Sequence, residues 1–412
     1  MKNIIFISKD ALNKHALPIY GNSYWETPNI RELAEKGTVF NRHYTAAAST
    51  AMAFTSMSLG KYCYETGRKY YKNEQAINGN TLFDKIHNLG FECHIMWDDT
   101  YTSFAKTHFK CEGLNTKIHS LHQIKQKETS HKKGQVDDMT FNDNETQIAL
   151  DMIKNEFIEI KNNAKKSLFI WLHLPHVMRG RQGYGSDIDV YDKVIGIARE
   201  LFGDNDIFIS ADHGHMNGWK GKYHYGFDIG EEAICIPLIG PKINGISEIS
   251  FPTSTLQMFD ILYNRKVKPL KYVMCETAYY AQPKRKVAII SGKYKYSYDK
   301  ETKKEYLYDL NFDPEENHNL VYPEFYDTDR FLWYSTSQCF YYPYWNEAMQ
   351  ILEKLRNIRK SMWKEGNFFE EQYNKILHRV KCIYTRIRLA HPSNNIKNMG
   401  KELIFLNYKI LR

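Results

Sequence analysis

The sequence contains no long apolar stretch. Among its 412 residues no run of eighteen consecutive apolar residues occurs, and the most apolar segments, 168–172 and 233–240, are only as long as a strand. A transmembrane helix needs about 20 apolar residues, so this class of protein is excluded. The apolar residues 4–7 are followed after Ser8 by the charged pair Lys9 and Asp10, and the segment is too short for the apolar region of a signal peptide. We therefore expect a cytoplasmic location.

Cysteines are few, and they show neither a metal-binding nor a redox pattern. The seven cysteines are odd in number and widely scattered, and no CxxC pair occurs. This usage favours a reduced chain with free thiols over a disulfide framework. There is also no internal repeat. Hydrophobic residues make up 42% of the chain and aromatic residues 14%, enough to form a large packed core, which excludes a disordered or fibrous protein.

The net charge is concentrated in one part of the chain. The 56 Lys and Arg exceed the 48 Asp and Glu by eight, and residues 343–412 alone contain that whole excess. Basic segments favour anionic partners. We interpret residues 343–412 as helices that pack on the rest of the protein. The alternative is that these helices also make peripheral contact with an anionic membrane at its inner face. No nucleic-acid-binding module is recognisable, so we expect no nucleic acid partner.

Strand-like and helix-like patterns alternate over the first half of the chain. Apolar strand patterns occupy 2–8, 91–97, 168–173 and 206–210, and helical patterns occupy 28–36, 50–59, 81–89, 144–161 and 192–201. This alternation predicts an α/β sandwich with a mostly parallel central sheet. We also expect a short strand at 38–44. The polar and charged segment 119–143 is interpreted as a long surface loop.

The pattern changes near residue 280. Segments 286–291, 293–298 and 305–310 alternate as antiparallel strands do, and helical spacing returns after Tyr342. We therefore predict three parts: a large α/β domain over residues 1–280, a small antiparallel β subdomain over 281–325, and a basic helical extension over 326–412.

Several groups of polar residues lie at predicted strand ends or in loops, where open α/β sheets bind ligands. They are Asp10, the pair Ser49-Thr50 at a helix start, the triplet Asp212-His213-Gly214, and the loop histidines His176 and His224. Each has a structural explanation when taken alone, since Asp, Ser and Thr are common helix caps and loop histidines are commonly solvated. Their order along the chain is what indicates a function.

This ordered set resembles the alkaline phosphatase superfamily in its sulfatase-like branch. The matching segments cover about residues 3–321 and are Asp10 with Tyr20-Gly21, the helix that begins Thr27-Pro28-Asn29, the helix that begins at Thr50, the SADHG motif 210–214, the segment 231–239, and the LYDL, DPE and NL residues of 307–320. The resemblance implies that residues 1–280 form a catalytic domain and that Asp10, Asp212 and His213 bind a metal.

The nucleophile position departs from that of the sulfatases themselves. Sulfatases oxidise a Cys or Ser within C/S-x-P-x-R to formylglycine, whereas this chain has Thr50 there, followed by Met52 and Phe54 in place of the proline and arginine. Threonine cannot form formylglycine. The resemblance therefore favours the branch with an unmodified threonine, which includes phosphoethanolamine transferases, phosphoglycerol transferases and phosphodiesterases.

The residue types suit that chemistry. Carboxylates from Asp10 and Asp212, the imidazole of His213 and the Thr50 hydroxyl form an oxygen and nitrogen donor set for one divalent ion, with Zn²⁺ or Mn²⁺ preferred and Mg²⁺ or Ca²⁺ as alternatives. A metal there would activate the hydroxyl as a nucleophile and polarise a phosphoryl oxygen.

The resemblance also implies residues on the substrate side. His176 and His224 are expected to donate a proton to the leaving group or to hold a weak second metal. Two-metal members have an Asp where this chain has Leu172, which favours one metal. Phosphate oxygens would be bound by Arg179, Arg181 and Lys222.

The predicted function is thus a metal-dependent phosphotransferase or phosphodiesterase that works through a covalent phospho-Thr50. Its substrate would be a phosphorylated small molecule, lipid or glycan, and its acceptor water or a sugar hydroxyl. Two alternatives stay open: a sulfuric ester hydrolase, and a non-catalytic family member that binds glycan.

Overall fold

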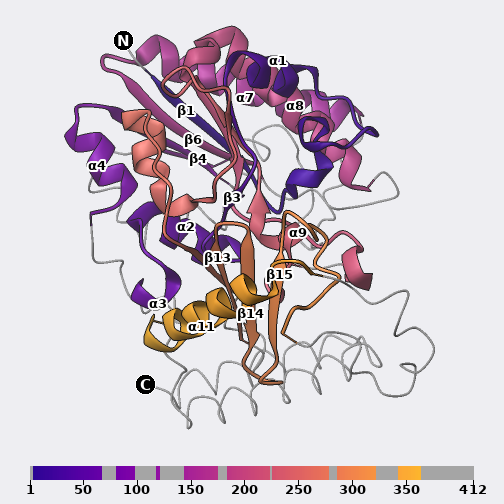
Figure 1. The fold of residues 1–412 in the computed structure, drawn as a ribbon. Coiled ribbons are helices and arrows are strands. Elements are labelled where there is room, and N and C mark those ends of the chain that lie inside the picture. Colours follow the sequence, from indigo (N-terminus) through magenta and orange to yellow (C-terminus); the bar gives the residue numbers. More distant parts are fainter. Residues whose placement is uncertain are drawn as a thin grey trace, which may run out of the picture.

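The central feature is an eight-stranded sheet, seen in a computed structural model that describes residues 3–66, 80–97, 117–120, 143–174, 183–222, 225–277, 285–321 and 342–362 (Figure 1). The strands lie in the order β10 (Glu248–Ile249), β2 (Thr38–Phe40), β9 (Leu238–Gly240), β7 (Ile207–Ala211), β1 (Ile4–Lys9), β6 (Leu168–Leu174), β4 (Glu92–Trp97) and β5 (Lys117–Ser120). β9 pairs antiparallel with β2 and β7, and the other pairs are parallel. The predicted α/β fold with a mostly parallel sheet is confirmed.

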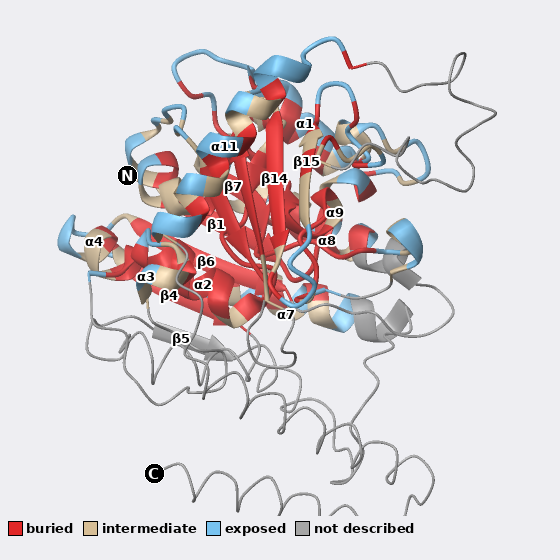
Figure 2. Ribbon diagram, turned by 60° about the horizontal axis from the view of Figure 1, so that its bottom comes forward, coloured by how far each residue is buried: buried red, intermediate tan, exposed pale blue. Residues whose placement is uncertain are grey.

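Both faces of the sheet are covered, which explains the unbroken apolar sequence of its inner strands. In β1, Ile5 and Ile7 face a core formed with α1 (Pro28–Lys36), α7 (Asp143–Asn163) and α8 (Gly183–Phe202). Ile4 and Phe6 face the opposite core, formed with α2 (Thr50–Leu59) and α4 (Leu82–Asn88). Figure 2 shows the inner strands β1, β6 and β7 buried and α4 partly exposed.

Two smaller sheets complete the described structure. A three-stranded sheet has the order β11 (Thr253–Ser254), β3 (His43–Tyr44) and β8 (Cys235–Ile236). An antiparallel sheet has the order β12 (Val273–Glu276), β13 (Lys286–Ser291), β14 (Tyr294–Asp299) and β15 (Glu305–Asp309), and α11 (Trp345–Met362) packs against it. The short helices α3 (Cys63–Thr66) and α9 (Glu231–Ile234) and the π-helical turn Asp260–Asn264 connect these layers.

Some local predictions were wrong. The strand expected at 38–44 is two strands, β2 and β3, that belong to different sheets. The loop expected at 119–143 begins inside β5, and its last residue starts α7. Within the described ranges β5 is an edge strand whose one partner is β4. An edge strand needs no continuous apolar run, so its polar sequence hid it. Residues 121–142 lie outside the described residues.

The basic segment 343–412 is described only as far as Met362, where α11 ends. Its predicted helical character is confirmed over that helix, whose Leu352 and Leu355 are buried against the antiparallel sheet. No helix within the described ranges is both long and apolar enough to cross a membrane. Membrane contact by this segment stays a prediction.

The junction of β1 and β7 depends on one buried hydroxyl. Tyr191 of α8 is fully buried, and its hydroxyl lies 3.0 Å from the carbonyl oxygens of both Ile7 and Ser210, close to the carboxyl ends of the two strands. We predict that Tyr191→Phe lowers the free energy of unfolding by about 1–2 kcal/mol, because the buried carbonyls lose a donor. Urea unfolding followed by circular dichroism measures this. Tyr24→Phe, at a side chain 79% exposed, is the control and should change nothing; equal stability of the two variants would contradict the prediction.

Candidate active site

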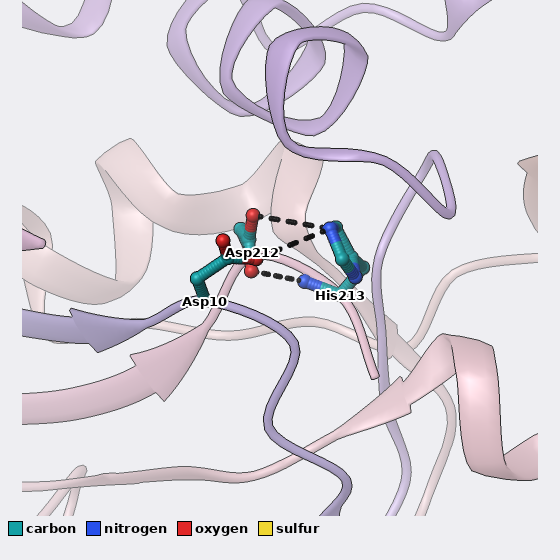
Figure 3. A group of neighbouring side chains, drawn as sticks. All are labelled: Asp10, Asp212 and His213. Carbon is teal, nitrogen blue, oxygen red and sulfur yellow. Dashed lines mark hydrogen bonds and ion pairs between the residues drawn. The ribbon is translucent and has the colours of Figure 1, made fainter. Parts of the chain in front are cut away.

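Three potential metal ligands converge at the carboxyl ends of β1 and β7. Asp10 follows β1, and Asp212 and His213 follow β7; these strands are parallel neighbours, so their carboxyl ends meet at one edge of the sheet. His213 Nε2 lies 3.5 Å from Asp10 Oδ1 and 3.4 Å from Asp212 Oδ2. One ligand atom from each residue lies within 4.8 Å of the others, and all three residues are buried (Figure 3).

The Asp212 carboxylate is oriented by backbone donors. Its Oδ1 accepts hydrogen bonds from the N–H groups of Ala11, at 3.1 Å, and His213, at 2.8 Å. Ala11 adopts a left-handed φ of 55°, uncommon for a residue with a side chain, at the turn where its N–H meets Asp212. The other oxygen, Oδ2, is buried and has no hydrogen-bond donor among the described residues. A buried carboxylate oxygen without a donor is a suitable ligand for a cation.

The His213 ring is held in the tautomer that a metal requires. Its Nδ1 lies 2.9 Å from the carbonyl oxygen of Gly214, and a carbonyl only accepts, so Nδ1 carries the proton. The lone pair of Nε2 then faces the two carboxylates, the arrangement typical of metal-binding histidines. Gly214 is required in this turn because a Cβ there would lie 2.1 Å from the carbonyl oxygen of Glu232.

Thr50 joins these ligands as the first residue of α2. Its Oγ1 lies 3.1 Å from His213 Nε2 and 3.4 Å from Asp10 Oδ1, and the residue is buried. The preceding Ser49 occupies the N-cap position but its hydroxyl caps no N–H group, and its buried Oγ has no hydrogen-bond partner in the described structure. The structure therefore brings together all four residues that the sequence analysis assigned to the metal.

The donor set fits one divalent cation. Two carboxylates, a neutral imidazole and a hydroxyl supply oxygen and nitrogen ligands, and buried carboxylates need a neutralising partner. Asp10, Thr50, Asp212 and His213 would hold the ion. Both Zn²⁺ and Mn²⁺ accept such ligands, so the geometry does not select between them.

Lys222 pairs with an acidic residue in the described structure. Its ammonium forms an ion pair with Asp228, and Lys286 pairs with the same carboxylate at 3.2 Å. Burial alone would raise the pKa of Asp228, but these two lysines lower it to about 2. The three residues line a cavity of 240 Å³ beside Trp219. No described contact joins Lys222 to Thr50, so its role on the phosphate stays a prediction.

The remaining predicted residues lie outside the described residues: His176, Arg179, Arg181 and His224. Their roles on the substrate side also stay predictions.

The sequence analysis missed Tyr225. Its ring stacks on that of His213, with the centroids 4.8 Å apart and the planes at 26°, and 37% of the side chain is exposed. It thus lies between a candidate metal ligand and solvent. Its adjacency to His224, which the analysis did select, was the available signal.

Comparison with known proteins agrees with this geometry. The sulfatase family model matches residues 2–232, more than half of the chain. An arylsulfatase of Clostridium perfringens is 32% identical over a stretch that spans only about a quarter of each chain, 25% of this one and 26% of the relative.

Solved structures match over nearly the whole length. A phosphonate monoester hydrolase of Agrobacterium radiobacter is 15% identical and has a TM-score of 0.60, with 88% of this chain and 96% of that chain covered. A 2-O GAG sulfatase is 14% identical and has a TM-score of 0.63, with 88% and 92% covered. At these identities the likeness shows a shared fold.

The chain belongs to the sulfatase family, within the alkaline phosphatase superfamily. Members of this family typically bind a divalent metal, and the cluster of Asp10, Asp212 and His213 is where this chain can do so.

We predict that metal stabilises the native protein through this cluster. Adding Zn²⁺ or Mn²⁺ at about 100 times its dissociation constant should raise the free energy of unfolding by about 2.7 kcal/mol. Asp212→Asn removes the charge of the ligand oxygen and should abolish both binding and stabilisation. The measurements are isothermal titration calorimetry and thermal unfolding with and without the metal.

Asp204→Asn is the matched control, because Asp204 is an acidic residue near the opposite end of β7, paired with Lys36 and Arg199. Unchanged metal affinity in Asp212→Asn would contradict the assignment of the site.

Proposed function

We propose that the protein cleaves a phosphate ester through a covalent phosphothreonine at Thr50. The observation that carries the proposal is the position of Thr50 Oγ1, 3.1 Å from His213 Nε2 and 3.4 Å from Asp10 Oδ1 at the start of a helix. A threonine at this position supports phosphoryl transfer over sulfate transfer, since it cannot be converted to formylglycine.

The reaction has two displacements at phosphorus. Thr50 Oγ attacks the phosphorus, its proton passes to a nearby base, and the bond from phosphorus to the leaving alkoxide breaks as that oxygen takes up a proton. Water or an acceptor hydroxyl then attacks the phosphothreonine and releases Thr50. A divalent ion, when bound, supplies Lewis acidity that favours the alkoxide form of Thr50 and neutralises phosphoryl oxygen charge.

The fold supplies electrostatic help at the same point. Thr50 begins α2, a helix of ten residues whose first N–H groups lack partners within the helix. The helix dipole and these N–H groups favour negative charge beside Thr50, by about 1 kcal/mol. Sulfatases have a proline and an arginine where this chain has Met52 and Phe54. Both side chains are buried and apolar, so neither binds an anion.

The substrate class is a phosphorylated small molecule, lipid or glycan. His176 and His224 are proposed to protonate the leaving alcohol or to bind a weak second metal, and Arg179 and Arg181 to bind phosphate oxygens. An acceptor hydroxyl on a sugar would make the protein a transferase of the phosphoethanolamine or phosphoglycerol type. We retain the proposals of a cytoplasmic location and of contact between residues 343–412 and an anionic membrane.

Hydrolysis of sulfate esters is the second candidate. It is favoured by the family match and by the arylsulfatase relative, and opposed by the residue at position 50. A panel of a phosphate diester, a phosphate monoester and a sulfate ester of the same chromogenic alcohol separates the two candidates directly.

We predict that the phosphate esters are cleaved faster than the sulfate ester and that Thr50→Ala lowers kcat by at least about 10³-fold, because the nucleophile is removed. Thr50→Ser should keep measurable activity. The assay measures release of the chromogenic alcohol at saturating metal, after circular dichroism has established that each variant is folded.

Thr55→Ala is the matched control: it is the same substitution at a buried position of the same helix, and it should retain activity. Sulfate ester cleavage that outpaces phosphate ester cleavage would overturn the proposed substrate class. Wild-type rates in Thr50→Ala would overturn the nucleophile.

A further inference from the structure

We propose that Lys295, on the antiparallel sheet, is a positioning residue for both His213 and Thr50, and that it acts through the short helix α9. This inference rests on the proposed function for the roles of those two residues, but the contacts that carry it do not involve substrate.

Lys295 is a fully buried cation between two buried carboxylates. Its ammonium on β14 lies 3.0 Å from Glu231 Oε1 and 2.6 Å from Glu316 Oε1. Glu231 is the first residue of α9, and its N–H donates to Glu316 Oε2 at 3.0 Å. Lys295 and Glu316 therefore fix the start of α9 by both charge and hydrogen bonding, from a different sheet than the one that carries the metal ligands.

From α9, one path of contacts leads to His213. The N–H of Gly214 donates to the carbonyl oxygen of Ala233 in α9 at 2.9 Å, and Gly214 passes so close to α9 that only glycine fits. The carbonyl of the same Gly214 accepts the Nδ1 proton of His213. The position of α9 thus sets the acceptor that fixes the tautomer of the proposed metal ligand.

A second path leads from α9 to Thr50. The Tyr44 hydroxyl donates to Glu231 Oε2 at 3.1 Å, and the N–H of Thr45 donates to the carbonyl oxygen of Ile234 at 3.0 Å. Tyr44 also pairs with Cys235 between β3 and β8. The chain runs from these residues directly into the helix that begins at Thr50. A shift of α9 would therefore displace the proposed nucleophile and the metal ligand together.

The charge of Lys295 is essential to this arrangement. Without the ammonium, Glu231 and Glu316 would repel each other as two buried carboxylates in one small volume, with Lys14 and Arg42 left as the cations near Glu231. Separation of the two carboxylates or uptake of a proton relieves that repulsion. Either response changes the hydrogen bonds that hold the first residue of α9. A purely apolar contact at this position could fill the space but could not orient α9 through its carboxylate.

The test compares Lys295→Met with Leu352→Ala. Leu352 is a buried residue of α11 that packs on the same antiparallel sheet and has no described contact with α9, so its truncation destabilises that sheet without touching the two paths. Zn²⁺ and Mn²⁺ affinities are measured by calorimetry on both full-length variants. We expect Lys295→Met to weaken affinity by about 10-fold or more, as loss of an outer-shell partner does, and Leu352→Ala to leave it unchanged.

A second readout uses the metal-free protein. The ¹⁵N chemical shifts of the His213 ring report its tautomer, and Lys295→Met should convert the single Nδ1-protonated form into a mixture, whereas Leu352→Ala should not. If Lys295→Met fails to fold, Glu231→Gln takes its place, since it leaves Lys295 paired with Glu316, removes the negative charge on α9, and leaves one acceptor oxygen for Lys295 and Tyr44 to share. Glu231→Gln should also weaken metal affinity and produce a mixture of His213 tautomers, both to a smaller extent than Lys295→Met.

A folded Lys295→Met or Glu231→Gln protein with wild-type metal affinity and a single wild-type tautomer would overturn the proposal. Equal losses of metal affinity in Lys295→Met and Leu352→Ala would overturn it as well, because Lys295 would then contribute only to the general stability of the protein. Neither readout involves ester turnover, so failure of the proposed phosphoester chemistry would be recognised separately.

Discussion

Burial of two carboxylates at one edge of the sheet is the constraint on which the site depends. Asp10 is 6% exposed and Asp212 is fully buried, and each has an oxygen within 3.5 Å of the same imidazole nitrogen. Such an arrangement is costly unless a cation or a proton shares it. Among the described residues, only one oxygen of Asp212 receives N–H donors. The open oxygen, the oriented His213 and the adjacent Thr50 together form a place where a cation can bind.

The large sheet alone does not complete this site. It provides the strand ends that carry Asp10 and Asp212, but the segment leading to Thr50 is held by β8 and by the end of β12, where Ala46 and Ala48 exchange backbone hydrogen bonds with Glu276. The helix α9 contacts Gly214, the residue after His213, and so supports His213. The antiparallel sheet is therefore part of the scaffold of the site and not an appended layer. This explains why the sequence resemblance extends past residue 300.

Sequence patterns located the fold and the cluster well because both have local signals. Strand β1 begins with the apolar run 4–7 and ends directly before Asp10, and the stop at Gly60 and the Ser49-Thr50 start mark α2. If β1 and β7 are parallel neighbours, Asp10 and Asp212 must lie side by side, because each follows the carboxyl end of its strand. The predicted limits of α2 match the structure, and those of β1 and β7 differ from it by one or two residues, as expected where element ends fray.

Other features had no local signal. The two-residue strands β3 and β8 are too short for a period of two, and their pairing joins residues almost two hundred positions apart. Lys222 was predicted to neutralise phosphate oxygens in place of the missing arginine, and nothing in the sequence indicated that its ammonium pairs with Asp228, six residues away. The Lys295 pairing joins three distant segments, and only the folded chain brings them together.

The central claim is that Thr50 becomes covalently phosphorylated during turnover. The most direct measurement is rapid acid quenching of the metal-loaded protein with a chromogenic phosphodiester, followed by proteolysis and mass spectrometry of the peptide that contains Thr50. The account predicts a mass increase from a phosphoryl group, or its esterified form, located on Thr50 and formed no more slowly than the alcohol is released. An unmodified Thr50 peptide throughout a single turnover that releases the alcohol would contradict it.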